Sequence, residues 1–134
     1  MTVEGFLDKS RPQDAARLAE IYTRAHLMIL PTRGDCTPMV IAEAMAHGTP
    51  VVVTDTGGTP EMLGGAGAGQ ILPLSATPID WAREIVSITS DQGVYDFMSD
   101  AAFDRASTCF SWDIWASEIA RITTEHYRVL ARAA

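Results

Sequence analysis

Two short apolar runs limit what this chain can fold into: HLMILP at residues 26–31 and VVVTD at 51–55. Runs of this length with apolar residues at successive positions are typical of parallel strands that are buried on both faces. Between them, Thr37 suits an N-cap and Pro38 the first helical position, and Gly48 suits the end of the helix. A strand, a helix and a second strand in this order predict a βαβ unit with parallel strands.

The remaining elements extend this alternation. The opening TVEGFL has strand-like residues, GAGQILPL contains a last strand, and helices are expected at 12–25, 60–63, 78–90, 92–107 and 112–132. At 134 residues, 47% of them apolar, the chain has the size of one domain with one core. We therefore expect an α/β fold, a doubly wound, Rossmann-like parallel sheet followed by a helical C-terminal tail.

Composition excludes several functions. The net charge is −7 with both signs interspersed, so no basic stripe is available for nucleic acid. Cys36 and Cys109 lie far apart, and no cluster with metal-ligand spacing or Ser/His/Asp order is found, so no metal and no hydrolase site is expected. No stretch approaches the ~20 apolar residues that span a bilayer. We expect a cytoplasmic protein without a transmembrane segment.

Two acids stand out near the first apolar run. Asp35 lies in the loop that follows it, and Glu43 is the one charged residue in MVIAEAMA at 39–46. Burying an ionised carboxylate without partners costs several kcal/mol, so Glu43 should reach solvent or face a ligand cleft. Ligands of doubly wound sheets bind outside the carboxyl ends of the strands, where this loop begins. The alternative is an ordinary loop acid and a solvent-facing helix residue.

The segment PTRGDCTPMVIAEAMAHGTPVVVTDTGGTPEML resembles the carboxyl-terminal domain of the group 1 glycosyltransferases, which are retaining, GT-B-fold enzymes that use nucleotide sugars. That family has two Glu residues separated by seven others, then Ala-Met-Ala-x-Gly-x-Pro-Val-Val and Gly-Gly-x-x-Glu. Here Asp35 replaces the first Glu, Glu43 is the second, and Gly57, Gly58 and Glu61 complete the pattern. GFL near the start and FSWDIWASEIARITTEHY near the end also resemble the family.

The resemblance implies a role for each matching residue. Glu43 would bind the ribose hydroxyls of a nucleotide sugar, and Asp35 would face the transferred sugar as a catalytic residue. The donor diphosphate would lie on the backbone of Cys36, Thr37, Pro38, Met39 and Val40, and the base on Gly5, Phe6 and Leu7. Asp35 is one methylene shorter than the usual Glu. Because Pro38 has no N–H, the amides of Met39 and Val40 would carry more of the phosphate contact.

The resemblance also implies a partner. Family members place the active site between two Rossmann-like domains, and a basic Arg and Lys pair lies upstream of the matching segment. We therefore expect residues 1–134 to form a single, truncated domain that lacks its amino-terminal Rossmann-like partner. It would be the donor-binding part of a retaining glycosyltransferase, inactive in isolation and without a cofactor.

Two alternatives remain open at this stage. One is a catalytically inactive nucleotide-sugar-binding or assembly module of the same fold, and the other is the nucleotide-sugar 2-epimerase class, which shares the two-domain architecture. The Glu-Ala-Met-Ala-x-Gly-x-Pro run favours the transferase. Nothing in these residues selects the base, the sugar or the acceptor.

Overall fold

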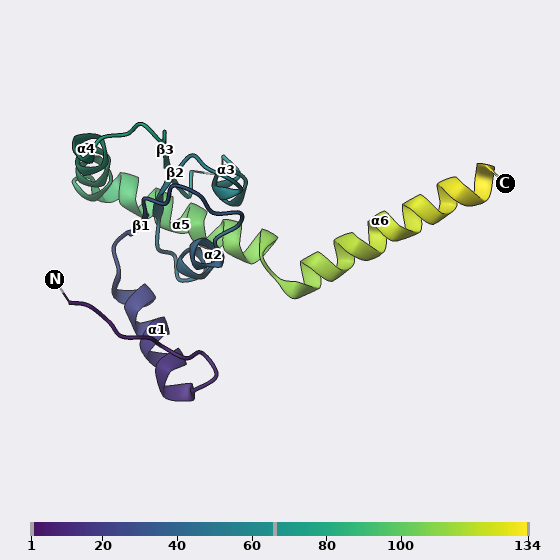
Figure 1. Cartoon of the computed structure of the whole chain (residues 1–134), viewed down its shortest axis with the longest axis horizontal. Helices are drawn as coiled ribbons and strands as arrows, with labels where there is room; N and C mark the ends of the chain where they lie inside the picture. Colours follow the sequence, from purple (N-terminus) through teal and green to yellow (C-terminus); the bar gives the residue numbers. More distant parts are fainter. Residues whose placement is uncertain (1, 66, 134) are drawn as a thin grey trace.

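A buried central strand organises the chain. The computed structural model describes residues 2–65 and 67–133, with the side chains of 129–133 left out. Its helices are α1 (Pro12–Arg24), α2 (Met39–Met45), α3 (Thr59–Leu63), α4 (Pro78–Thr89), α5 (Gln92–Cys109) and α6 (Trp112–Ala133), and its strands are β1 (Met28–Leu30), β2 (Val51–Thr54) and β3 (Gly69–Leu72). Figure 1 shows the sheet surrounded by α2 to α5, with α6 extending away.

The three strands form one parallel sheet in the order β1-β2-β3. Met28 pairs with Val51, which pairs in turn with Gly69. Parallel neighbours need crossover connections, and α2 and α3 supply them. The expected α/β fold with a parallel sheet is confirmed. Among the described strands the order does not reverse.

Helices cover both faces of the sheet. Val51 and Val53 pack on one face in a cluster that includes residues of α2, α3 and α5. Val52 points to the opposite face, where it packs with Ile88 and Trp81 of α4. Because successive side chains of a strand alternate between faces, full burial of all three valines requires cover on both sides. Helical cover on both faces agrees with the predicted Rossmann-like α/β fold.

Local side-chain bonds determine where several helices begin. Thr77 and Asp80 form a reciprocal capping box at the start of α4, and the Asp91 side chain accepts from the amides of Gly93 (2.8 Å) and Val94 (3.1 Å) at the start of α5. The bounds of α4 and α5, and also those of α1 and α6, lie within two residues of the predicted ones.

The start of α2 differs from the prediction by one residue. Pro38, not Thr37, is the N-cap, and its backbone is extended, with φ −72° and ψ 104°. The carbonyl of Pro38 accepts the first helical hydrogen bond from the amide of Ile41 at 3.0 Å. Pro38 therefore flanks the helix instead of occupying its first turn, and no side chain caps this end within the described residues.

Two strand predictions were wrong. Residues 2–7 contain no strand, and Phe6 is 93% exposed, because no neighbouring strand of the described sheet offers this segment a ladder of hydrogen bonds. The run at 26–31 forms β1, but β1 is not buried on both faces, since Ile29 is 43% exposed. Ile29 lines an open groove of about 550 Å³ together with Trp81. No helix of the described residues fills the space over it.

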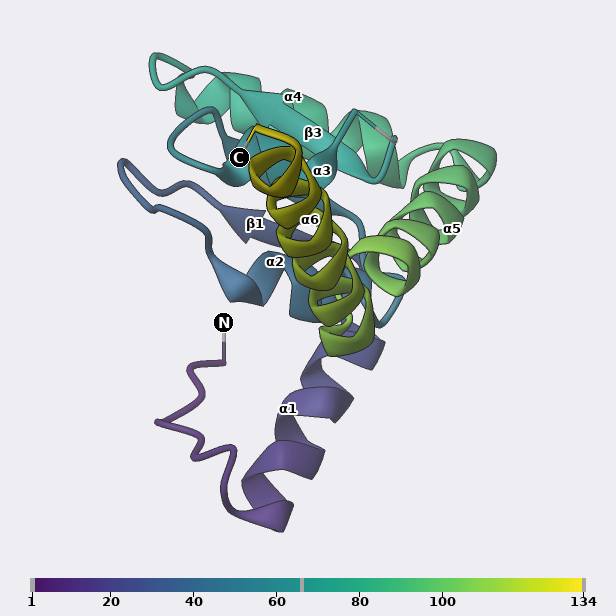
Figure 2. The same cartoon turned by 90° about the vertical axis from the view of Figure 1, so that its right-hand side faces the viewer.

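The last helix stands clear of the sheet. Among the helices and strands described, α6 makes its main contacts with α5, and Trp112, Trp115, Ile119 and Ile122 along it are exposed. Figure 2 views α6 nearly along its axis, in front of the other elements. The helical tail is confirmed. Within the described part of the chain, no helix is both long enough and apolar enough to cross a bilayer.

Two isoleucines allow the uneven cover of the sheet to be tested. Ile41 is 0% exposed, so we expect Ile41→Ala to lower the free energy of unfolding by about 2–5 kcal/mol. Ile29→Ala removes the same atoms from an open site and should cost about 1 kcal/mol or less. Urea unfolding of both variants measures the difference. Equal costs would show that Ile29 is covered in solution.

Candidate functional site

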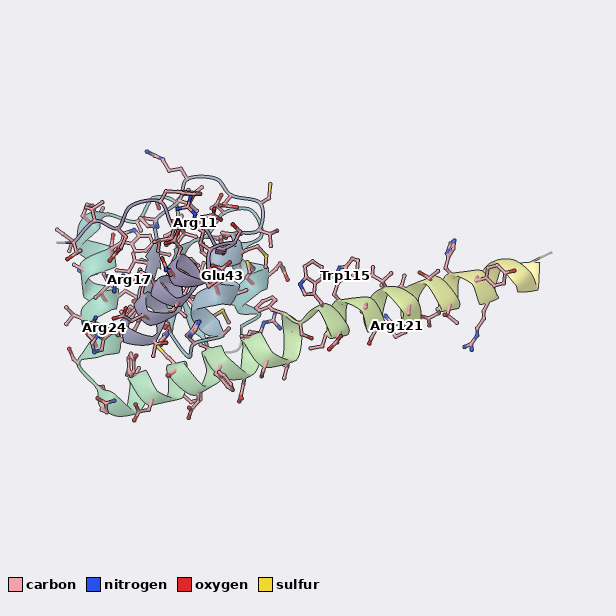
Figure 3. The ribbon with its side chains drawn as sticks, turned by 90° about the horizontal axis from the view of Figure 1, so that it is seen from below. Arg11, Arg17, Arg24, Glu43, Trp115 and Arg121 are labelled. Atoms are coloured by element: carbon pink, nitrogen blue, oxygen red, sulfur yellow. The ribbon has the colours of Figure 1, made fainter. Side chains whose placement is uncertain are left out.

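Glu43 lies at the edge of a groove between α1 and α2. Its side chain is 29% exposed, and the groove, of about 340 Å³, is also lined by Leu18, Tyr22 and His47. Figure 3 shows Glu43 beside α1, on a helix whose other residues from Ile41 to Met45 are buried. A single carboxylate on an otherwise apolar helix therefore faces a partly open space.

Both carboxylate oxygens of Glu43 have partners within the chain. The Tyr22 hydroxyl donates to Oε2 at 3.1 Å, and the Lys9 ammonium forms an ion pair with Oε1. Burial of Tyr22, its hydrogen bond to Glu43 and the charge of Glu43 raise the pKa of Tyr22 to about 12. The tyrosine therefore remains a hydrogen-bond donor over the physiological pH range.

Tyr22 is held in place from several sides. Its ring stacks on His47, with centroids 5.6 Å apart and planes 17° from parallel. The buried Thr49 donates its hydroxyl to the backbone carbonyl of Tyr22 at 2.9 Å. These contacts join the last turn of α1 to the connection between α2 and β2. The hydroxyl that contacts Glu43 therefore projects from a fixed ring.

Asp35 is placed by its backbone. In the loop after β1, Thr32 bonds to the amide (3.3 Å) and carbonyl (3.2 Å) of Gly34. Among the described residues, no hydrogen bond or ion pair engages the exposed Asp35 carboxylate. The loop after β2 packs directly against this segment, since the Gly58 amide donates to the Cys36 carbonyl at 2.7 Å.

Two glycines allow these loops to approach each other. A Cβ on Gly58 would lie 2.3 Å from the Cys36 carbonyl oxygen, and a Cβ on Gly57 would lie 1.8 Å from that of Asp35. Gly57 also has φ +52°, which favours glycine. The buried Thr59 fixes the end of this loop by donating to the Thr54 carbonyl at 2.5 Å. The glycines thus set the position of the Asp35 backbone.

The structure does not bring all predicted site residues into one cavity. Within the described residues, the groove at Glu43 is lined neither by 5–7 nor by 35–40, and the larger groove at the strand ends contains neither acid. Met39 (60% exposed), Val40, Cys36 and Thr37 are exposed while Pro38 is buried. Of the segment before α1, Gly5 and Phe6 are exposed and Leu7 is half-buried.

Sequence reasoning missed Tyr22 and Lys9. Tyr22 falls within the helix predicted at 12–25 and Lys9 precedes it, and they lie 21 and 34 residues from Glu43. The one available signal was the tyrosine itself, because a tyrosine on a packed face usually needs a hydrogen-bond partner for its hydroxyl. Nothing in the spacing indicated which acid accepts that bond.

Comparison with known proteins decides the family. A profile of the family described as "Glycosyl transferases group 1" matches residues 2–91. The chain belongs to this family. It is similar to D-inositol 3-phosphate glycosyltransferases of Streptomyces bingchenggensis (31% identical over 83% of this chain) and Corynebacterium kroppenstedtii (33% over 92%).

A solved structure agrees with this membership. Sucrose-phosphate synthase from Thermosynechococcus elongatus matches 88% of this group 1 chain with a TM-score of 0.70 and 25% identity. The matches cover 24% and 26% of the two curated relatives and 28% of the solved chain. The group 1 chain thus spans about a quarter of their length. The expected GT-B family resemblance is confirmed.

The packing of the two loops leads to a prediction for Gly57. Gly57→Ala should lower the free energy of unfolding by about 2–5 kcal/mol, because the methyl group meets backbone atoms of Asp35 and the left-handed backbone is strained. Gly65 is a matched control, since it has φ +66° and open space around its Cβ position. Gly65→Ala should cost only about 1–2 kcal/mol. Similar costs in urea unfolding would contradict the close loop contact.

The environment of Tyr22 leads to a prediction for high pH. Its folded pKa of about 12 lies above the unfolded value of about 10. The folded state therefore holds the proton longer, and the stability that Tyr22 contributes below pH 10 should be lost as the pH rises toward 12. Tyrosinate absorbance should show a transition at about 12 that is missing in Tyr22→Phe and present in Tyr127→Phe. A transition unchanged in Tyr22→Phe would contradict this assignment.

Proposed function

We propose that this chain is the donor-binding part of a retaining glycosyltransferase, which transfers a sugar from a nucleoside diphosphate sugar to an acceptor. The observation that carries the proposal is Glu43, a carboxylate on an apolar helix, partly open to a groove, in a segment that matches the group 1 family. An ionised carboxylate accepts at about four lone-pair positions. Tyr22 and Lys9 use two of them, so two hydroxyls of a ribose can still be accepted.

Asp35 takes a different role in this proposal. Its exposed carboxylate has no partner among the described residues, and the glycine-packed backbone holds it at the carboxyl end of β1. It would accept hydrogen bonds from the transferred sugar. In a retaining transfer the donor phosphate lies beside the incoming acceptor hydroxyl, so no basic side chain of this chain is required. We also propose that no metal takes part, and turnover should then be unchanged by EDTA.

The remaining contacts come from the adjoining backbone and from a second domain. The segment 36–40 would lie along the diphosphate and 5–7 along the base, with an amino-terminal Rossmann-like domain closing the cleft and holding the acceptor. The short match to much longer relatives supports this division. The 134-residue chain alone should therefore show no sugar transfer.

Substitutions of the two acids in the complete enzyme distinguish their roles. Glu43→Gln should weaken nucleoside diphosphate and nucleotide sugar alike by about 1.5–3 kcal/mol, because hydrogen bonds to the charged acceptor are lost. Asp35→Asn should leave the affinity for the bare diphosphate almost unchanged and lower the turnover of the nucleotide sugar. Calorimetry with UDP, GDP, ADP and TDP, and initial rates with their sugars, measure both effects.

The controls separate the proposal from its alternatives. D-inositol 3-phosphate, the compound in the names of the two relatives, is the first acceptor to assay. Effects below about 0.5 kcal/mol in both variants would identify ordinary surface acids. Nucleotide binding without turnover in the complete protein would instead favour the inactive binding module.

A further inference from the structure

The bond from Tyr22 to Glu43 engages one of the two carboxylate oxygens. Tyr22 is a half-buried residue of α1, and its hydroxyl contacts only Oε2 of Glu43, at 3.1 Å. Lys9 approaches the other oxygen, Oε1, from the loop before α1. The acid on α2 is thus held by donors from two segments that precede it by more than twenty residues.

The two donors differ in how firmly they are placed. The Tyr22 ring is stacked on His47, and its backbone carbonyl accepts a bond from the buried Thr49. The Lys9 side chain is 59% exposed and projects from a loop. An exposed ion pair of this kind contributes little, since solvent screens it and a long side chain must be ordered. Tyr22 can therefore hold an orientation that Lys9 cannot impose.

We propose that Tyr22 is a positioning residue, which holds the Glu43 carboxylate by Oε2 so that Oε1 and the remaining lone pairs face the groove for the hydroxyls of the ligand. This inference rests on the proposed role of Glu43 in nucleotide binding. Lys9 neutralises the carboxylate through Oε1 and leaves the remaining lone pairs to the ligand hydroxyls. Without Tyr22 the carboxylate is free to rotate and must be ordered by the ligand.

A double-mutant cycle tests this role. Calorimetry with UDP, GDP, ADP and TDP is carried out on the complete enzyme and on its Tyr22→Phe, Glu43→Gln and doubly substituted forms. Tyr22→Phe should weaken the bound nucleotide about fivefold, the scale of one hydrogen bond. In the Glu43→Gln background the same change should have less than a twofold effect, because no carboxylate is left to position. Thermal melts confirm that each variant is folded.

Two further variants serve as matched controls. Tyr95→Phe removes the hydroxyl of another half-buried tyrosine, one that packs on the opposite face of the sheet, and should leave affinity unchanged. Lys9→Met should change affinity by less than twofold. A Lys9→Met effect as large as that of Tyr22→Phe would overturn the assignment to Tyr22 alone.

The outcomes separate this inference from the proposed function. If no nucleotide binds the unsubstituted enzyme, both are wrong. If nucleotide binds and Glu43→Gln weakens it while Tyr22→Phe does not, only the positioning role is wrong. If Tyr22→Phe has the same effect with and without Glu43, the tyrosine merely packs α1 against α2, and the positioning role is again overturned.

Discussion

The complete burial of β2 is the constraint on which the rest of the structure depends. All four of its residues are buried, so both faces must be covered and both edges paired. Parallel pairing on both edges forces the chain to cross from one end of the sheet to the other through α2 and α3. The loops that begin these crossings, after β1 and after β2, then emerge at the same edge. The contact of Gly57 and Gly58 with Asp35 and Cys36 follows from this topology.

Sequence patterns predicted the elements that are determined by residues close to them in the chain. The caps of α4 and α5 come from Thr77, Asp80 and Asp91, which act on amides within three residues. Three of the four buried residues of β2 are consecutive valines, at positions 51–53. Where burial depended on neighbours far along the chain, the patterns failed: Ile29 belongs to an equally apolar run, yet no described helix covers it, and residues 2–7 have no strand to pair with.

The same distinction between local and long-range causes applies to the candidate site. The family pattern selected Glu43, and its isolation on an apolar helix predicted a special environment. The structure supplies the cause, which is a pair of donors from the region of α1. Their contacts with Glu43 depend on how α1 docks on α2, and the stacking of Tyr22 on His47 shows that this docking has its own specific contacts. The sequence periodicity of either helix does not indicate the angle at which the two helices pack.

The two acids are held by different means, and this difference bears on how the site tolerates change. Asp35 is placed through its main chain, which the loop at Gly57 and Gly58 supports, so its side chain can be exchanged without moving the loop. Glu43 is placed through its side chain, and its two oxygens have different partners. The side chain at position 35 is therefore open to variation in length, such as the shorter Asp found here. Glu43 is bonded to Tyr22 of α1, so a substitution of Tyr22 changes the surroundings of Glu43 without changing Glu43 itself.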